Sequence, residues 1–258
     1  MNRAAGKTGD GLRMYDEMAD WFHLLTAPEE YDDEAAFILA ALRESVEGPF
    51  ETLLELGAGG GNTASHLRSS LRLTLTDISP AMLDLSRKLN PDCEHLVADM
   101  RTARLGRTFD AVLIHDAIMY MATEEHLRAA LTTAFIHTRP GGAAIITPDC
   151  VRETFEPSTS HGGHDGEGRA LRYLEWTYDP DPADTSYVTD FAILLREGDR
   201  DVRVRYDRHV MGLFARDTWT GLLRETGFEP AGLIDHDRDI FLGRRPITGP
   251  APDASVRE

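Results

Sequence analysis

Short apolar runs alternate with amphipathic segments between residues 50 and 150. The apolar runs predict buried strands, and segments with apolar residues three or four apart predict helices. Strands are expected over residues 52–56, 72–77, 93–99, 109–116 and 143–149. Helices are expected over residues 62–70, 79–90 and 123–138. This alternation predicts an α/β fold with a doubly wound, mostly parallel sheet that helices cover on both faces.

The segments on either side of this core follow other patterns. Apolar and aromatic residues at helical spacing predict a helix over 12–25 and a second helix over 33–47. Beyond residue 150 a loop is expected over 158–168. Three runs rich in β-formers then predict an antiparallel β-meander, and they cover residues 171–178, 186–197 and 202–214. A helix over 215–228 and one or two strands over 229–243 complete the chain.

These patterns predict one domain that carries an insertion. An N-terminal helical lid (11–48) precedes the α/β core (49–150), which is expected to bind a cofactor. The β-meander insertion (151–212) is expected as a layer added to the main sheet, because a core helix and the last strands return after it (213–245). The remaining residues, 1–10 and 246–258, are polar or rich in Pro and Gly and are expected to be flexible tails. Ser79 before Pro80 is expected to be a helix N-cap, and Asn62 or Thr63 is expected near another.

Charge and cysteine content narrow the classes of function. Among 258 residues, 44 are acidic and 27 are Lys or Arg, giving a formal net charge of −17. Such a chain repels nucleic acid and anionic membranes, so neither is an expected partner. The two cysteines fit a reducing compartment, and no apolar run approaches membrane-spanning length. The start of the chain also lacks the apolar core of a signal peptide, so a cytoplasmic location is expected.

The stretch "ETLLELGAGGG" (51–61) places a glycine-rich loop after the first expected strand. Ligands of open α/β sheets bind at such a point, and glycines let a ligand approach the backbone. A phosphate-binding loop would need a Gly-Lys-Ser/Thr ending, which is missing. The dinucleotide pattern G-x-G-x-x-G is matched poorly because residue 62 is Asn. Binding of S-adenosyl-L-methionine, with S-adenosyl-L-homocysteine as product, is the third interpretation.

Acidic residues at successive strand ends favour that third interpretation. Glu55 can position a cationic amino group, Asp77 can accept hydrogen bonds from ribose hydroxyls, and Asp99 can accept one from an adenine amino group. Any one of these alone could be an ordinary strand end or a helix cap. The expected cofactor-binding residues are Tyr15, Glu55, Gly57, Ala58, Gly59, Asp77, Ile78, Met82, Asp99, Met100 and His115.

The core resembles the class I S-adenosylmethionine-dependent methyltransferases over residues 50–150. "ELGAGGG" is similar to that family's E/D-x-G-x-G-x-G loop, and "RPGG" (139–142) is similar to the turn before its fifth strand. "MYDEMADWF" near the start, the meander and "LFARDTWTGLLRETGF" (213–228) resemble bacterial N-methyltransferases that act on nucleotide-linked amino sugars. The resemblance implies a Rossmann-like methyltransferase fold, an aromatic N-terminal helix over the cofactor and a meander on the substrate side.

Candidate catalytic residues surround the expected acceptor position. His115 could line the cofactor or act as a base, Asp116 could orient a cationic amine, and Tyr120 could bind the acceptor. Tyr15 could lie over the sulfonium, where an aromatic ring favours a cation. Each residue also has an ordinary structural interpretation, as a hydrogen-bonded strand end, a cap or part of an apolar face. Trp176 and His209 of the meander are further candidates for substrate contact.

Methyl transfer to a small-molecule amine, such as an amino sugar or a natural-product intermediate, is the expected function. The alternatives are O-methylation of a hydroxyl or carboxylate, an NAD-dependent dehydrogenase, and a cofactor-binding module without catalysis. A homodimer through the β-meander is also considered. No metal is expected, because the "HGGH" pair His161 and His164 has only Asp165 as a nearby third ligand.

Overall fold

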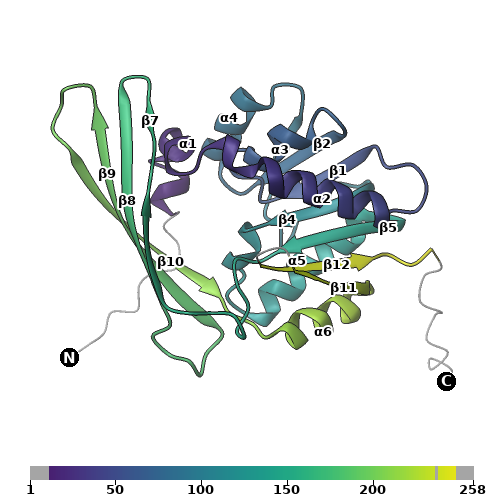
Figure 1. Ribbon diagram of the computed structural model, residues 1–258. Coiled ribbons are helices and arrows are strands. Elements are labelled where there is room, and N and C mark those ends of the chain that lie inside the picture. Colours follow the sequence, from purple (N-terminus) through teal and green to yellow (C-terminus); the bar gives the residue numbers. More distant parts are fainter. Residues whose placement is uncertain (1–11, 236–237, 248–258) are drawn as a thin grey trace.

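The main sheet carries the architecture that the sequence predicts (Figure 1). The computed structural model describes residues 12–235 and 238–247, and it orders the seven strands of this sheet β11-β12-β5-β4-β1-β2-β3. The strands are β1 Thr52–Leu56, β2 Arg72–Asp77, β3 Glu94–Val97, β4 Phe109–His115, β5 Thr138–Thr147, β11 Glu229–Asp235 and β12 Asp239–Arg244. Strands β1 to β5 pair in parallel, and β12 runs antiparallel to both of its neighbours. The strand order reverses between β1 and β4, where ligands of such sheets bind.

Helices cover both faces of this sheet, which confirms the doubly wound fold. One apolar core packs α2 (Asp32–Ser45) and α3 (Asn62–Leu67) on one face, with α4 (Pro80–Leu89) beside α3. The other core packs α5 (Glu124–His137) and α6 (Arg216–Thr226) on the opposite face. In the described ranges, no helix combines the length and apolar character that crossing a membrane requires.

The insertion forms a second sheet of its own beside the first (Figure 1). Its strands are β6 Ser158–Gly162, β7 Asp165–Gly166, β8 Arg169–Tyr178, β9 Ser186–Glu197 and β10 Arg203–Gly212. They pair antiparallel in the order β10-β9-β8-β6, with β7 also on β8. The prediction of a loop over 158–168 was wrong, because β6 and β7 pair with β8 through backbone groups that need no apolar side chains.

The N-terminal segment is not the single helix that the spacing over 12–25 predicts. It divides into η1 (Arg13–Tyr15), η2 (Ala19–Trp21) and α1 (Phe22–Leu25), followed by η3 (Pro28–Tyr31). Tertiary hydrogen bonds tie this segment to other parts of the chain. The Met14 N–H donates to Asp207, and the Tyr15 carbonyl accepts from the Ser79 hydroxyl. The expected tails 1–10 and 246–258 lie outside the described residues, apart from residues 246 and 247.

Caps set the orientation of the helices that follow β1 and β2. Ser79 is the N-cap of α4, as predicted, and its hydroxyl accepts a hydrogen bond from the Met82 N–H. The N-cap of α3 is Gly61, so Asn62 lies next to the cap as predicted, and Gly61 has a φ of +80°. A β-carbon there would lie 2.3 Å from both Asn90 Nδ2 and Ser86 Oγ. Glycine is therefore required at this position by conformation and by space.

Replacing Gly61 with alanine is expected to lower the free energy of unfolding by roughly 2–4 kcal/mol. The cost combines a left-handed backbone with collisions against Ser86 and Asn90. Gly48→Ala is the matched control, since Gly48 has a φ of +79° and nothing within 4 Å of a new β-carbon. Urea unfolding of both variants measures the difference. Equal losses would show that the close packing at Gly61 contributes nothing.

Candidate active site

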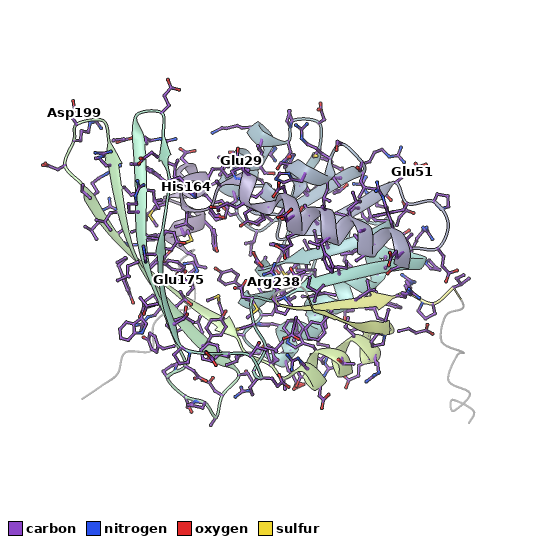
Figure 2. All side chains as sticks on the ribbon, viewed as in Figure 1. Glu29, Glu51, His164, Glu175, Asp199 and Arg238 are labelled. Carbon is purple, nitrogen blue, oxygen red and sulfur yellow. The ribbon has the colours of Figure 1, made fainter. Side chains whose placement is uncertain are left out.

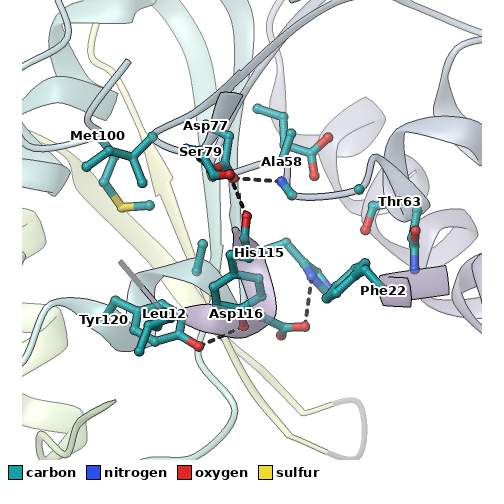
Figure 3. Close-up of a pocket in the computed structure, with 18 of the residues that line it drawn as sticks. Leu12, Phe22, Ala58, Thr63, Asp77, Ser79, Met100, His115, Asp116 and Tyr120 are labelled. Atoms are coloured by element: carbon teal, nitrogen blue, oxygen red, sulfur yellow. Dashed lines mark hydrogen bonds and ion pairs between the residues drawn. The ribbon is translucent and has the colours of Figure 1, made fainter. Parts of the chain in front are cut away.

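A cavity of about 500 Å³ opens at the carboxyl ends of the central strands. Its volume suits a cofactor together with part of a small substrate. Figure 3 shows Met100 and Thr63 on opposite sides of this cavity, with Asp77 and Asp116 between them and Tyr120 below Met100. Twelve of the predicted site residues line it: Tyr15, Glu55, Gly57, Ala58, Gly59, Asp77, Ile78, Asp99, Met100, His115, Asp116 and Tyr120.

The glycine-rich loop keeps one wall of the cavity free of side chains. The N–H groups of Gly57 and Ala58 both donate to the Thr76 carbonyl at 2.8 Å, which holds the loop against β2. Gly57 has a φ of +79°, and a β-carbon there would lie 2.4 Å from the Ala117 Cβ. Any larger residue at this position would push into the cavity wall.

Asp77 joins the end of β2 to this loop. Its Oδ2 accepts the Gly59 N–H and its Oδ1 accepts the Ser79 N–H, each at 2.8 Å. A carboxylate has further lone pairs, so Asp77 can still accept hydrogen bonds from a ligand in the cavity. Ile78 also lines the cavity and is 64% exposed. Met82 is fully buried beneath the Gly59 backbone and is not among the lining residues.

The end of β3 contributes Asp99 and Met100. Asp99 accepts hydrogen bonds from the side chain and the backbone N–H of Arg101, which lower the pKa of its carboxyl. Asp99 therefore already has a cationic partner, and a ligand amino group would share that carboxylate. The Met100 thioether packs close to Gly57 and gives this end of the cavity an apolar surface.

Glu55 is a buried carboxylate with an unused oxygen. It is 2% exposed, and its Oε2 has no hydrogen-bond partner among the described residues. Burial raises the pKa of Glu55 to about 7, with nearby Asp77 and Asp116 adding to the rise against the opposing effect of His115. Such a group is costly to keep ionised without a cation. A ligand ammonium at this position would satisfy it.

His115 lies at the centre of an ion-pair network at the end of β4. Its Nε2 lies 2.8 Å from Glu34 and its Nδ1 lies 3.1 Å from Asp116. Burial alone would lower the pKa of His115, but the Asp116 and Glu34 carboxylates outweigh it and raise that pKa to about 10. The two carboxylates therefore favour the imidazolium form, while Nη2 of Arg238 also lies 2.8 Å from Nε2. This makes the imidazole a poor base and a good orienting group for the two carboxylates.

Arg238, which precedes β12, completes this network from the other side. Its guanidinium binds Glu34, donates to Asp116 at 2.6 Å and lies 3.5 Å from Asp149. Figure 2 shows Arg238 near the centre of the molecule, where the two sheets approach each other. Among the non-glycine residues described, Asp116 alone has a positive φ, of 43°. A strained backbone held by charged partners is typical of functional sites.

Tyr15 and Tyr120 meet at the side of the cavity that faces the second sheet. Their hydroxyls are 2.7 Å apart, and the Tyr120 hydroxyl is also 2.7 Å from His209 Nδ1. His209 is 1% exposed and lies behind Tyr120, so it does not line the cavity itself. Burial raises the pKa of both tyrosines above the usual value, which keeps both phenols protonated.

The expectation that Trp176 contacts substrate was wrong. Trp176 is 57% exposed on the outer face of the second sheet, because strand alternation turns it away from the cavity. The two histidines of "HGGH" lie in different surroundings, and His164 pairs with Glu30 at 3.0 Å. In residues 12–235 and 238–247, no three His, Cys, Asp or Glu side chains cluster as a metal site would require.

Three charged residues of the site were not predicted from the sequence. Asp149 follows β5 and lines the cavity, so an acid after the fifth strand was a signal that could have been used. Glu34 lies on α2 and Arg238 lies between β11 and β12, far from any recognised motif. Both reach the site only through the folded structure.

Comparisons with known proteins agree with this geometry. A family profile described as "Methyltransferase domain" matches residues 53–142. The chain is 34% identical, over 49% of its length, to dTDP-3-amino-3,4,6-trideoxy-alpha-D-glucopyranose N,N-dimethyltransferase of Streptomyces venezuelae. It is 28% identical, over 80% of its length, to dTDP-3-amino-3,6-dideoxy-alpha-D-glucopyranose N,N-dimethyltransferase of Streptomyces fradiae. It is also 28% identical, over 88% of its length, to trans-aconitate 2-methyltransferase of Klebsiella pneumoniae (strain 342).

The extent of these matches differs between the relatives. The alignment spans about half of the first relative (54%), and 78% and 87% of the other two. Among solved structures, Streptomyces venezuelae DesVI superposes with a TM-score of 0.78 at 24% identity, covering 89% of this chain and 97% of the other. That similarity shows the fold. Residues 53–142 therefore form a methyltransferase domain, and this match supports an S-adenosylmethionine-dependent methyltransferase over the dehydrogenase interpretation.

Proposed function

We propose that this enzyme methylates an amine nitrogen of a small molecule, with an amino sugar or a related natural-product intermediate as acceptor. The excess of acidic over basic side chains around the cavity carries this proposal. His115 and Arg238 supply two positive charges. Glu34 and Asp116 pair with these cations, and burial raises the pKa of three further carboxyl groups at the cavity, Asp149, Glu55 and Asp77, so each of the three would gain from a cationic ligand. An acceptor ammonium is attracted to such a site, whereas a carboxylate acceptor is repelled.

The lining residues support a division of this cavity between cofactor and acceptor. Bound S-adenosylmethionine supplies an electrophilic methyl group on a sulfonium. Asp77 would bind ribose hydroxyls, Asp99 and Met100 would bind adenine, and Glu55 would pair with the amino group. Tyr15, Tyr120, Asp116 and Asp149 then surround the space left for the acceptor. Their task is to align the nitrogen with the methyl carbon and to keep water out.

Labelled S-adenosylmethionine and a panel of acceptors test the proposal. The panel contains nucleotide-linked amino sugars, simple primary amines, the matching hydroxy sugars and a tricarboxylic acid such as trans-aconitate. Mass spectrometry of the products is expected to place the methyl group on nitrogen. Transfer to a carboxylate or to a hydroxyl alone would overturn the amine assignment in favour of O-methylation.

Affinity for S-adenosylmethionine is expected to weaken as the pH falls through about 7. Only ionised Glu55 can pair with the cofactor's ammonium, and burial raises the pKa of this carboxyl to about 7 in the free protein. Each pH unit below that value should cost about tenfold in Kd. The raised pKa means that the folded protein favours the neutral form of Glu55. The contribution of Glu55 to the free energy of unfolding is therefore lost as pH rises through about 7. Glu55→Gln should then stabilise the free protein at higher pH.

Calorimetric titrations from pH 5.5 to 8 measure this dependence. Glu55→Gln should bind more weakly at pH 8 and show a flat profile at lower pH. Glu51→Gln, at an exposed position just before β1, is the matched control and should follow the wild type. A wild-type profile that stays flat through pH 7 would remove Glu55 from the amino-group site.

We also propose that two copies meet through the outer face of the second sheet. This face exposes large apolar side chains from three neighbouring strands: Leu174, Trp176, Leu194, Val204, Tyr206 and Val210. An apolar patch of this kind on a sheet favours association. Sedimentation equilibrium tests the dimer, and a monomer at micromolar concentration would contradict it.

Two free cysteines, Cys93 and Cys150, support a cytoplasmic location.

A further inference from the structure

A chain of hydrogen bonds leads from the cavity into the second sheet. The Tyr15 hydroxyl lies 2.7 Å from that of Tyr120, which lies 2.7 Å from Nδ1 of His209. Nε2 of His209 lies 3.3 Å from Oδ2 of Asp207. The two tyrosines line the cavity, whereas His209 and Asp207 are buried behind them. The chain therefore links a group that can touch substrate to a buried carboxylate.

Strand geometry explains why these groups meet. Asp207 and His209 are two residues apart in β10, so both side chains point to the inner face, while Arg208 between them points outward. Phe191 of β9 packs on the His209 ring with a centroid distance of 5.0 Å. The nearby charged groups are Asp207 beside the imidazole and, acting through space on Tyr15, Asp149, Asp116 and Asp77.

Asp207, at the inner end, sets the donor-to-acceptor direction of these hydrogen bonds. Burial alone would raise the pKa of Asp207, but hydrogen bonds from His209 and from the Met14 N–H outweigh it and lower that pKa. An ionised carboxylate only accepts, so Nε2 of His209 carries the proton and Nδ1 accepts the Tyr120 hydroxyl. The Tyr120 oxygen then accepts from Tyr15. The Tyr15 oxygen is left with lone pairs that can accept from a donor in the cavity.

We propose that this chain is a proton relay that deprotonates the acceptor nitrogen. An N–H bond of the acceptor ammonium breaks and its electron pair remains on nitrogen. Tyr15 takes this proton as its own passes to Tyr120, and the Tyr120 proton passes to Nδ1 of His209. Both phenols end neutral, and the new imidazolium is balanced by Asp207. Tyr15 contacts the substrate, while His209 and Asp207 are positioning residues that act through it.

The proposed amine methylation, on which the relay rests, requires that the acceptor nitrogen lose a proton. An ammonium has no lone pair with which to attack a methyl group, so it must lose a proton first. A methylated amine must lose another before it can be methylated again. Both ring nitrogens of His115 already have partners, since Nε2 lies 2.8 Å from Glu34 and 2.8 Å from Arg238 and Nδ1 lies 3.1 Å from Asp116. The Tyr15 oxygen lies at the cavity and can accept the proton, because no carboxylate occupies its free lone pairs.

The variant His209→Asn tests the relay in the full-length enzyme. Asparagine can keep a hydrogen bond to Tyr120 but cannot take up a proton. With a primary amine that the wild type methylates, kcat at pH 7 should fall about 10-fold or more, while the Kd for S-adenosylmethionine stays within about twofold. The variant's rate should then rise about tenfold per pH unit as free amine accumulates, whereas the wild-type rate levels off at lower pH. His161→Asn, on exposed β6, is the matched control.

A second measurement does not depend on turnover. Nitrogen-15 NMR of the wild-type imidazole is expected to show the proton of His209 on Nε2. A proton on Nδ1, an unchanged rate in His209→Asn, or an equal loss at every pH would overturn the relay while leaving amine methylation intact. A wild type that methylates no amine would instead overturn the proposed function, and the relay with it.

Discussion

Asp77→Ala is expected to raise the Kd for S-adenosylmethionine by about 5- to 150-fold, which corresponds to about 1–3 kcal/mol. The carboxylate lies at the end of β2 and lines the cavity, where it can accept hydrogen bonds from ribose hydroxyls. It also accepts the Gly59 and Ser79 N–H groups, so its removal loosens the glycine loop that forms the wall. Isothermal titration calorimetry measures the change in affinity.

Two comparisons separate ribose binding from loop support. Asp84→Ala removes an exposed carboxylate from α4 and should leave the Kd unchanged. Asp77→Asn keeps one oxygen that can accept a backbone N–H, so the free energy of unfolding should fall less than in Asp77→Ala. If Asp77→Ala binds the cofactor as tightly as the wild type does, the ribose assignment is wrong.

The α/β core could be predicted from the sequence because its strands and helices follow from local patterns of apolar residues. Strands β1 and β2 begin and end where the apolar runs do, since both faces of a parallel strand are buried. Glu55, Asp77 and Asp99 were found for a related reason. Carboxyl ends of neighbouring parallel strands meet at one edge, so residues at or just beyond the end of each run converge on one cavity.

Features that depend on contacts between distant segments were not predictable. Glu34 and Arg238 are 204 residues apart, and no periodicity indicates that both bind around His115. The N-terminal segment is bound to Asp207 and Ser79 by hydrogen bonds, which local spacing cannot reveal. The side that Trp176 faces depends on how the second sheet packs, and strand alternation alone leaves both faces possible.

The second large effect is expected at Tyr120, which connects the acceptor space to His209. Tyr120→Phe should lower kcat by about 10- to 100-fold with the Kd for S-adenosylmethionine within about twofold, because the lost hydroxyl serves the acceptor and not the cofactor. Steady-state kinetics and calorimetry measure the two quantities. Tyr206→Phe, on the outward face of β10, is the control and should retain wild-type kinetics. A larger loss in cofactor affinity than in turnover would move Tyr120 out of the acceptor site.

Combining Tyr120→Phe with His209→Asn shows whether the two residues act as one unit. Either change interrupts the same path between Tyr15 and Asp207, so a second interruption has nothing left to remove. The double variant is therefore expected to be about as slow as the slower single variant, rather than slower by the product of the two effects. Independent packing roles would give multiplied losses, because side chains that act separately contribute additively to the activation free energy. The hydrogen bond of 2.7 Å between the Tyr120 hydroxyl and His209 Nδ1 would then be a structural contact only.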